Sequence, residues 1–157
     1  MYSAAILTIS DRCFKGQMKD LSGPAIKDMI RDIAKVEKIE IIPDDYDLIK
    51  LKLINFVDEL KVDFIFTTGG TGPGPRDITP EATLAVLEKV IPGIPEFMRA
   101  QTQPLTSTAI LSRARAGIRR KTLIINLPGS VKGVMENLNV ILGILKHTKE
   151  MIDGEGH

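Results

Sequence analysis

The stretch TTGGTGPGPRDITPEAT, residues 67–83, decides how the rest of the chain is organised. It follows the apolar run at residues 64–66 and leads into a helical pattern that starts at Pro80. Its glycines allow positive φ angles, and consecutive N–H groups in such turns form concave nests for anions. A strand, a glycine loop and a helix in this order are typical of a phosphate or carboxylate site. The alternative is an ordinary tight surface loop, because short glycine motifs are weak evidence alone.

Two charged residues directly after the glycines favour the functional interpretation. Arg76 and Asp77 place a cation and a carboxylate beside the expected anion nest. This combination suits a phosphate with a bound metal ion better than it suits a plain turn.

The rest of the chain alternates apolar runs with helical patterns. We expect strands at residues 4–9, 39–42, 64–68 and 122–127. Helical patterns begin near residues 22, 48, 80 and 131. This order is typical of an α/β domain with three layers, in which a mostly parallel central sheet carries helices on both faces. We expect residues 1–157 to form a single domain, since the chain has no linker, repeat or low-complexity segment.

Several finer expectations concern the helices and the connections. The stripe of the second helix is read as Leu48, Leu51, Ile54, Val57 and Leu60, and Thr79 is read as the N-cap of the third. Residues 91–104 hold three prolines and predict a loop with at least one helical turn. The basic stretches at residues 111–113 and 117–120 are expected to be irregular, and the tail from residue 151 to 157 to fray.

Polar residues follow each expected strand. Ser10 and Asp11 follow the first, and they suit either a ligand site or a simple turn or cap. Asp44, Asp45 and Asp47 follow the second, where carboxylates suit either Mg²⁺ or the start of a helix. The segment 129–130, Gly-Ser, follows the fourth. Parallel strands end at one edge of a sheet, so the sequence predicts that these clusters meet the glycine loop there.

Composition and missing motifs exclude several classes of function. A net charge of +1 and 4% aromatic residues argue against nucleic-acid binding, and no apolar run is long enough to span a membrane. One cysteine excludes an internal disulfide, and the N-terminus does not read as an export signal, so we expect a cytoplasmic protein. No lysine follows the glycines as a Walker loop requires, and neither histidine is placed for catalysis. A site with glycines and carboxylates but no nucleophile favours phosphoryl or nucleotidyl transfer.

The motifs together resemble one known family. TISDRCF, IIPDD, TTGGTG followed by PRDITPEAT, and LSRARAGIRRKTLIINLPGS, in this order over residues 2–150, are similar to the molybdopterin adenylyltransferases. That family includes the bacterial MogA-type enzymes and the G domain of gephyrin. The resemblance implies an α/β fold, a homotrimer, and transfer of AMP from Mg-ATP to the terminal phosphate of molybdopterin. It also implies possible delivery of the product to a molybdenum insertion protein.

The resemblance also assigns roles to residues of this chain. Asp44 and Asp77 resemble the two aspartates that the family needs for catalysis, and we expect them to hold Mg²⁺, directly or through water. Further residues are expected to line the substrate and nucleotide site: Ser10, Asp11, Thr68, Gly69, Gly70, Thr71, Gly72, Arg76, Asn126, Pro128, Gly129 and Ser130. The turn at residues 73–75 departs from the family pattern, so its contacts are not carried over.

Three other interpretations remain from the sequence. MoaB-type proteins share much of the pattern, although Asp44, Arg76-Asp77 and the segment LPGS favour the MogA type. A non-catalytic molybdopterin-binding or scaffold domain is possible in principle, but simple binding does not require two carboxylates beside a phosphate nest. The third is a shared fold with another phosphorylated metabolite as ligand.

Overall fold

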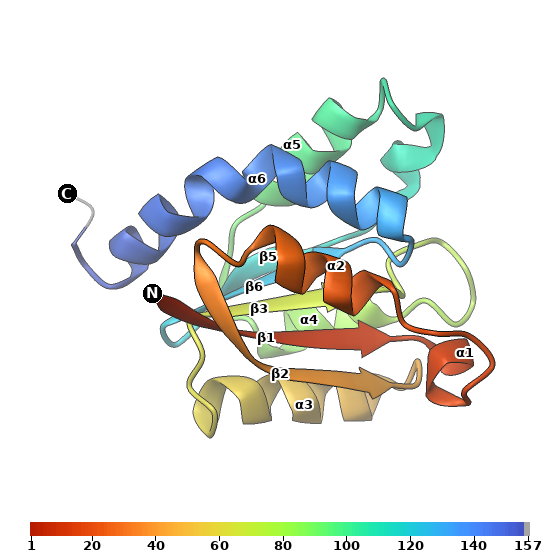
Figure 1. The fold of residues 1–157 in the computed structure, drawn as a ribbon, viewed down its shortest axis with the longest axis horizontal. Coiled ribbons are helices and arrows are strands. Elements are labelled where there is room, and N and C mark those ends of the chain that lie inside the picture. Colours follow the sequence, from red (N-terminus) through yellow and green to blue (C-terminus); the bar gives the residue numbers. More distant parts are fainter. Residues whose placement is uncertain (156–157) are drawn as a thin grey trace.

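One six-stranded sheet, in the order β2-β1-β3-β6-β5-β4, forms the centre of the computed structural model, which describes residues 1–155 (Figure 1). The strands are β1 (Tyr2–Ile9), β2 (Ala34–Ile42), β3 (Phe64–Thr68), β4 (Lys89–Val90), β5 (Ala116–Arg119) and β6 (Thr122–Leu127). The helices are α1 (Asp11–Phe14), α2 (Ser22–Met29), α3 (Tyr46–Asp58), α4 (Thr79–Val86), α5 (Gly93–Thr102) and α6 (Val131–Ile152), with a 3₁₀ helix η1 (Ser107–Leu111).

The four strands predicted from sequence are the parallel part of this sheet. β2, β1, β3 and β6 run in the same direction, and β5 and β4 are antiparallel additions at one edge. β3 is buried along its whole length because helices cover both faces, which explains the apolar run at residues 64–66. The expected three-layer α/β fold with a mostly parallel sheet is therefore confirmed, and the antiparallel edge makes the sheet mixed.

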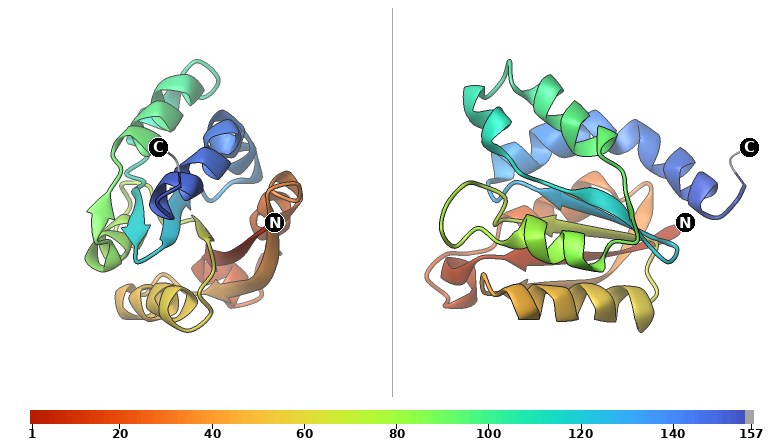
Figure 2. Two further views of the ribbon diagram at one scale, coloured as in Figure 1. Left: turned by 90° about the vertical axis from the view of Figure 1, so that its left-hand side faces the viewer. Right: turned by 180° about the vertical axis from the view of Figure 1, so that it is seen from behind.

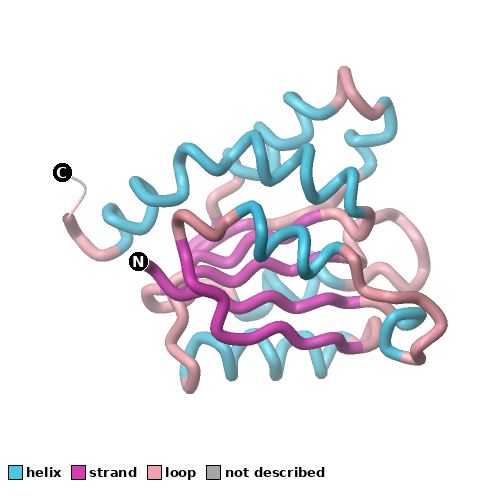
Figure 3. The backbone as a smooth tube through the Cα atoms, viewed as in Figure 1, coloured by secondary structure: helices cyan, strands magenta, loops and turns pink. Residues whose placement is uncertain are grey.

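Helices cover both faces of the sheet, as the rotated views and the tube show (Figures 2 and 3), and a hydrophobic core lies on each face. Phe64 and Phe66 point to the face covered by α2, α5 and α6, whereas Ile65 points to the face covered by α3 and α4. This alternation is the period of a strand. Burying each such large side chain contributes about 1.5–3 kcal/mol, which fixes the register of the central strands.

The apolar stripe predicted for α3 is wrong in part. The side chains that α3 buries are Ile49, Leu53, Phe56 and Val57, whereas Leu51 is 61% exposed. The reason is that residues 49, 53, 56 and 57 also have helical spacing, and the larger Phe56 fills the core. Leu60, also predicted to be buried, lies beyond the end of the helix.

The region 91–120, predicted from its prolines and arginines to be loop and irregular structure, contains a helix and a strand. Residues 93–102 form the full helix α5, with Pro95 in its first turn, where a missing N–H does no harm. The basic segment predicted to be irregular contains β5, which pairs with β6 and β4. Both outcomes follow from tertiary packing, because Ile94, Met98 and Ala116 are buried in the core.

The ends of the helices confirm one predicted cap and contradict another. Ser130 caps α6 by accepting a hydrogen bond from Gly133 N at 3.0 Å. Thr79 does not cap α4: Ile78 holds the N-cap position, and Thr79 is the first helical residue. The tail predicted to fray is helical as far as Ile152, and residues 156–157 lie outside the described part. Within residues 1–155, no helix is both long enough and apolar enough to cross a membrane.

Candidate functional site

A pocket of about 420 Å³, here called the strand-end pocket, lies where the parallel strands end. It receives residues from all four predicted polar clusters: Ser10 after β1, Asp44 after β2, Gly69, Gly70 and Asp77 after β3, and Gly129 and Ser130 after β6. Figure 1 shows this end of the sheet at the strand arrowheads, beside α1 and the loop before α4. The predicted convergence is confirmed, because the strand order places these four carboxyl ends together.

The glycine loop needs glycine for two separate reasons. Gly69 and Gly70 both have positive φ angles, 102° and 68°. A side chain at Gly69 would collide with Ile9 O, and one at Gly70 would collide with Thr79 Oγ1. The loop therefore packs directly on the end of β1 and on the start of α4, and any larger residue would move it.

The N–H groups of this loop are available to a ligand. Gly69 N donates to Leu127 O at 3.1 Å. Within residues 1–155, the N–H groups of Gly70, Thr71 and Gly72 make no hydrogen bond. Consecutive free N–H groups in a turn with positive φ form an anion nest, so the loop can hold phosphate oxygens.

Asp77 lies inside the curve of the loop. Its Oδ2 accepts a hydrogen bond from Gly74 N at 2.9 Å, and Gly74 O accepts one from Asp77 N at 3.1 Å. A Cβ at Gly72 or Gly74 would come within 2.9 or 2.8 Å of Asp77 Oδ2. The loop thus wraps closely around one carboxylate, and Asp77 also lines the strand-end pocket.

Asp11, Asp44 and Arg76 form a linked set at the same edge. Asp11 N donates to Asp44 Oδ2 at 3.1 Å, and Asp44 N donates to Asp11 Oδ1 at 3.0 Å. Arg76 donates to both carboxylate oxygens of Asp11, from Nε at 3.0 Å and from Nη2 at 3.1 Å. These bonds tie the ends of β1 and β2 to the glycine loop.

The two carboxylates of this set have opposite pKa shifts. The hydrogen bonds from Arg76, followed by the bond from Asp44 N, lower the pKa of Asp11. Burial raises the pKa of Asp44, and the negative charges of Asp11 and Asp77 raise it further, against the hydrogen bond from Asp11 N. Asp44 therefore carries a charge that the protein itself does not fully compensate, which is typical of a ligand site.

The oxygen donors in and beside the strand-end pocket are of the type that a magnesium ion takes. Asp44 and Asp77 supply carboxylate oxygens to one pocket, and Thr79 Oγ1, next to Gly70, is a buried oxygen without a hydrogen-bond partner within residues 1–155. Residues 1–155 contain no group of three or more acidic, histidine or cysteine side chains that could hold a metal alone. Mg²⁺ characteristically takes one or two carboxylates and completes its shell with water and substrate phosphates.

Not every predicted site residue lines this pocket. Asn126 is fully buried in the sheet, where its amide bonds Thr67 Oγ1, Thr83 Oγ1 and Arg115 N, so it supports the fold instead. Asp45 caps α3 by accepting from Leu48 N at 2.9 Å.

Other predicted residues lie at the rim of the site. Thr71, Gly72 and Pro128 line an adjoining cavity of about 370 Å³, which Ser130 shares with the strand-end pocket. Thr68 lines the strand-end pocket and donates to Pro128 O at 2.6 Å.

Sequence reasoning missed two residues that shape the site. Asp20 lines the pocket, accepts from Thr8 Oγ1 at 2.9 Å and caps the N-terminus of α2. Its place just before the helix start at Ser22 was a signal for this cap. Arg113 hydrogen-bonds the glycine loop from outside the pocket, and no local pattern could have revealed it.

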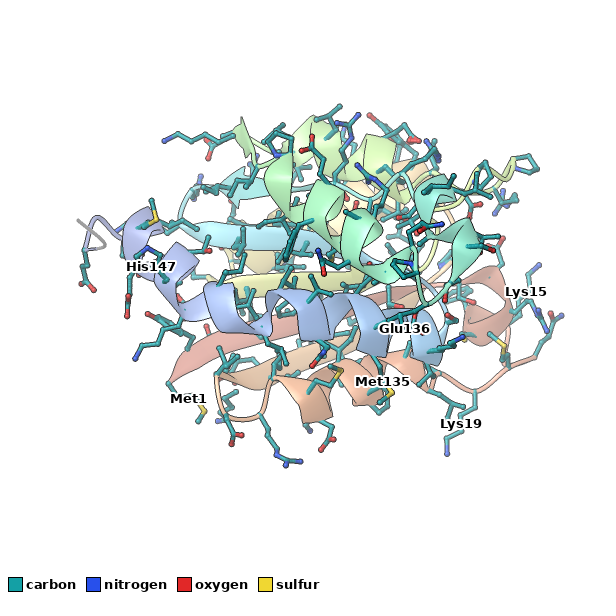
Figure 4. The ribbon with its side chains drawn as sticks, turned by 90° about the horizontal axis from the view of Figure 1, so that it is seen from above. Met1, Lys15, Lys19, Met135, Glu136 and His147 are labelled. Atoms are coloured by element: carbon teal, nitrogen blue, oxygen red, sulfur yellow. The ribbon has the colours of Figure 1, made fainter. Side chains whose placement is uncertain are left out.

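The ends of α6 differ in their distance from the site. Figure 4 shows Glu136, Lys15 and Lys19 toward one end of the molecule and His147 at the other. His147 lies 3.8 Å from Glu150 within α6 and takes no part in the strand-end pocket.

Comparison with known proteins gives consistent matches along the chain. A family model described as "Probable molybdopterin binding domain" matches residues 5–147. The molybdopterin adenylyltransferase of Helicobacter pylori (strain J99) is 45% identical over 152 residues, covering 95% of this chain and 86% of that protein. The molybdopterin adenylyltransferase of Escherichia coli (strain K12) is 40% identical over 136 residues, covering 85% and 70%. The crystal structure of the molybdopterin biosynthesis enzyme MoaB from Thermus thermophilus has a TM-score of 0.93 and 41% identity, covering 98% of each chain.

Proposed function

The chain belongs to the family described as probable molybdopterin binding domains, and from this premise we propose that it is a molybdopterin adenylyltransferase. It transfers AMP from ATP to the terminal phosphate of molybdopterin, giving adenylyl-molybdopterin and pyrophosphate. The observation that carries the proposal is the strand-end pocket, which brings together Asp44 after β2, Asp77 in the loop after β3, and Gly70, whose N–H makes no hydrogen bond within residues 1–155. The similarity to the Helicobacter pylori enzyme supports the choice of substrate.

The reaction needs no nucleophile from the protein. A phosphate oxygen of molybdopterin attacks the α-phosphorus of ATP, a new P–O–P bond forms, and the bond between the α-phosphorus and the pyrophosphate oxygen breaks. The attacking phosphate is already an anion, so little proton removal is required. The work of the protein is to align the two phosphates and to stabilise charge.

The residues of the pocket can perform these two tasks. The N–H group of Gly70 in this pocket, and those of Thr71 and Gly72 at the adjoining cavity, would hold phosphate oxygens that gain charge in the transition state. Arg76, now paired with Asp11, adds positive charge at the rim. Asp44 and Asp77 would hold magnesium, which offsets the repulsion between the phosphates and stabilises the departing pyrophosphate.

The assembly and the surroundings of the enzyme are part of the proposal. We propose a homotrimer, and the exposed apolar side chains Leu84, Val90 and Phe97, near a groove of about 510 Å³, are available for contacts between copies. Sedimentation equilibrium tests this state. We also propose that the enzyme acts in the cytoplasm and hands its product to a molybdenum insertion protein.

A MoaB-type role is the second candidate function. The similarity to the Thermus thermophilus structure supports it directly, because that solved chain is called MoaB and aligns with nearly the whole of this one. A non-catalytic molybdopterin-binding domain belongs to the same alternative. A chain of either kind that lacks transfer activity would bind molybdopterin, but it would release no pyrophosphate from ATP.

The deciding experiment measures pyrophosphate release with molybdopterin, ATP and Mg²⁺. The wild type is compared with Asp44→Ala, Asp77→Ala, the double variant, and Asp32→Ala as a control at an exposed carboxylate. If Asp44 and Asp77 serve one metal-bound triphosphate, each single change cripples the same step and the double change costs much less than the product. Strictly multiplicative losses, or full wild-type turnover without a divalent metal, would contradict the shared-metal site. No turnover by the wild type under any metal would contradict the adenylyltransferase itself.

A further inference from the structure

Arg113 lies between η1 and β5 and reaches both ends of the turn at residues 72–77. Its Nε donates to Gly72 O at 2.8 Å, and its Nη2 donates to Asp77 O at 2.9 Å. Its backbone N–H donates to Thr71 O, also at 2.8 Å. A residue 41 positions away from Gly72 in the sequence thus closes the mouth of the glycine loop.

Glu81 fixes the orientation of this guanidinium. Arg113 Nη1 donates to both carboxylate oxygens of Glu81, at 2.5 and 3.0 Å, and Glu81 lies in the first turn of α4. The two side chains are 40% and 38% exposed, so their ion pair contributes only about 0–1 kcal/mol to the free energy of unfolding. The ion pair instead fixes the orientation of the guanidinium group, because the rigid fork of Arg113 can donate to Glu81 and to two loop carbonyls at once.

The loop depends on such polar contacts, since little packing holds it. Pro73, Pro75 and Arg76 are exposed, and Gly72 and Gly74 have no side chains to bury. Asp77 nevertheless lines the strand-end pocket from this loop, and its Oδ2 accepts a hydrogen bond from Gly74 N within the turn. A displacement of about 1 Å in a reacting geometry can cost roughly a hundredfold in rate.

We propose that Arg113 is a positioning residue for the transfer reaction, which holds the backbone at Gly72 and Asp77 so that the Asp77 carboxylate faces the substrate phosphates. This inference rests on the proposed function. Arg113 acts from outside, because it lines the groove on the far side of the loop and not the strand-end pocket. Lysine cannot replace it, since an ammonium group lacks the planar fork that spans the two carbonyls.

Amide hydrogen exchange on the ligand-free protein tests the positioning directly. The variants Arg113→Lys and Arg113→Met are compared with Arg115→Lys and Arg115→Met, which make the same changes at an exposed arginine lining the same groove. We expect the amides of Gly74 and Asp77, which are hydrogen-bonded within the loop, to exchange at least about tenfold faster in both Arg113 variants. The Arg115 variants should exchange as the wild type does.

Kinetics then separates positioning from general support of the fold. Both Arg113 variants should lose roughly ten- to a hundredfold in kcat, while the KM for molybdopterin stays within about threefold and the Tm shifts by only a few degrees. Unchanged exchange in the loop, a wild-type kcat for Arg113→Lys, or a loss fully explained by unfolding would overturn the proposal. If the wild type transfers no AMP at all, the proposed function fails, and the exchange data still decide whether Arg113 holds the loop.

Discussion

The two ends of the sheet use charged and polar groups in opposite ways. At the amino ends of β3 and β6, the buried Lys149 donates to Lys121 O and to Asp153 Oδ1, both at 2.7 Å, and lies 3.2 Å from Asp63 Oδ1. We call these residues the amino-end cluster. At the carboxyl ends, burial raises the pKa of Asp44, and within residues 1–155 Thr79 Oγ1 has no hydrogen-bond partner. The amino-end groups have their partners within the chain, whereas the two carboxyl-end groups leave some bonding capacity unused, as expected if the proposed ligand binds there.

The largest expected effect comes from the same change at both ends. Asp77→Asn keeps an oxygen for Gly74 N but removes the charge, so AMP transfer should fall about a hundredfold or more with little change in Tm. Asp63→Asn, at the amino-end cluster, should lower the Tm and leave transfer nearly unchanged. The measurements are pyrophosphate release and thermal unfolding. If Asp77→Asn transfers AMP within about threefold of the wild-type rate, Asp77 has no role in the reaction, and the carboxyl ends of the strands are not shown to differ in function from the amino ends.

The next effect concerns stability alone. Lys149→Met keeps a long side chain at this buried position but leaves Asp63 and Asp153 without their cation. Breaking a buried ion pair costs about 3–5 kcal/mol, and because these carboxylates are 29% and 25% exposed and can regain water, we expect about 2–4 kcal/mol. Urea unfolding measures the loss, with Lys146→Met at an exposed position of α6 as the control. A loss no greater than that of the control would mean that the amino-end cluster does not hold the fold.

A smaller pair of effects should have opposite signs. Thr122 Oγ1 donates to Val62 O at 2.6 Å, so Thr122→Val leaves a buried carbonyl unpaired and should cost about 1 kcal/mol. Thr79→Val removes a buried hydroxyl without a partner within residues 1–155, and stability should stay the same or rise by up to about 1 kcal/mol. Affinity for Mg-ATP, measured by calorimetry, should fall only for Thr79→Val. Equal destabilisation by both changes would show that Thr79 is as structural as Thr122.

The smallest effects are the pH-dependent ones. Burial raises the pKa of Asp44 above its ordinary value of 3.8, so ionised Asp44 opposes folding, and its contribution to stability is lost as pH rises through that pKa. Asp44→Asn should therefore be slightly more stable than the wild type at pH 7 without metal. The hydrogen bonds from Arg76 lower the pKa of Asp11, so Asp11→Asn should be less stable at neutral pH, and the difference should shrink as pH falls through the pKa of Asp11. Urea unfolding at pH 7 and at acidic pH checks both signs.

The pH dependence of transfer activity should also reflect the protonation of Asp44. If Asp44 acts as a metal ligand, kcat/KM for Mg-ATP falls when acid protonates Asp44 in the metal-free enzyme, where burial raises the pKa of this carboxyl above its ordinary range. An acid limb that stays unchanged in Asp44→Asn would assign the loss to another group.

The parallel strands of the sheet could be predicted from the sequence, whereas the antiparallel strands β4 and β5 at its edge could not. The predicted strand at residues 64–68 agrees with β3, since the apolar run at residues 64–66 is typical of a strand buried on both faces. β5 has only four residues beside several arginines, and its pairing with β6 depends on a turn that no local signal marks. The helix α5 was hidden by Pro95, which the first turn of a helix tolerates.

The site was predictable where it depends on strand ends and not where it depends on long-range contacts. Asp44, Gly70 and Asp77 meet because parallel strands end together, which the alternating pattern implied. Asn126 lies within β6 and not after its end. Its side chain therefore contacts Thr67 and Thr83 and does not line the pocket. Arg113 could not be found, because its partners are backbone carbonyls of a distant loop.

The position of β6 has a consequence for the order in which the chain can be completed. β6 is the last of the strands within residues 1–155, yet it lies between β3 and β5 in the middle of the sheet. Until residues 122–127 leave the ribosome, β3 presents an open edge with the sequence FIFTT. An unpaired apolar edge is a template for pairing with other chains. A nascent or truncated chain that ends near Arg120 would therefore be prone to aggregation, and the final strand closes this exposed edge.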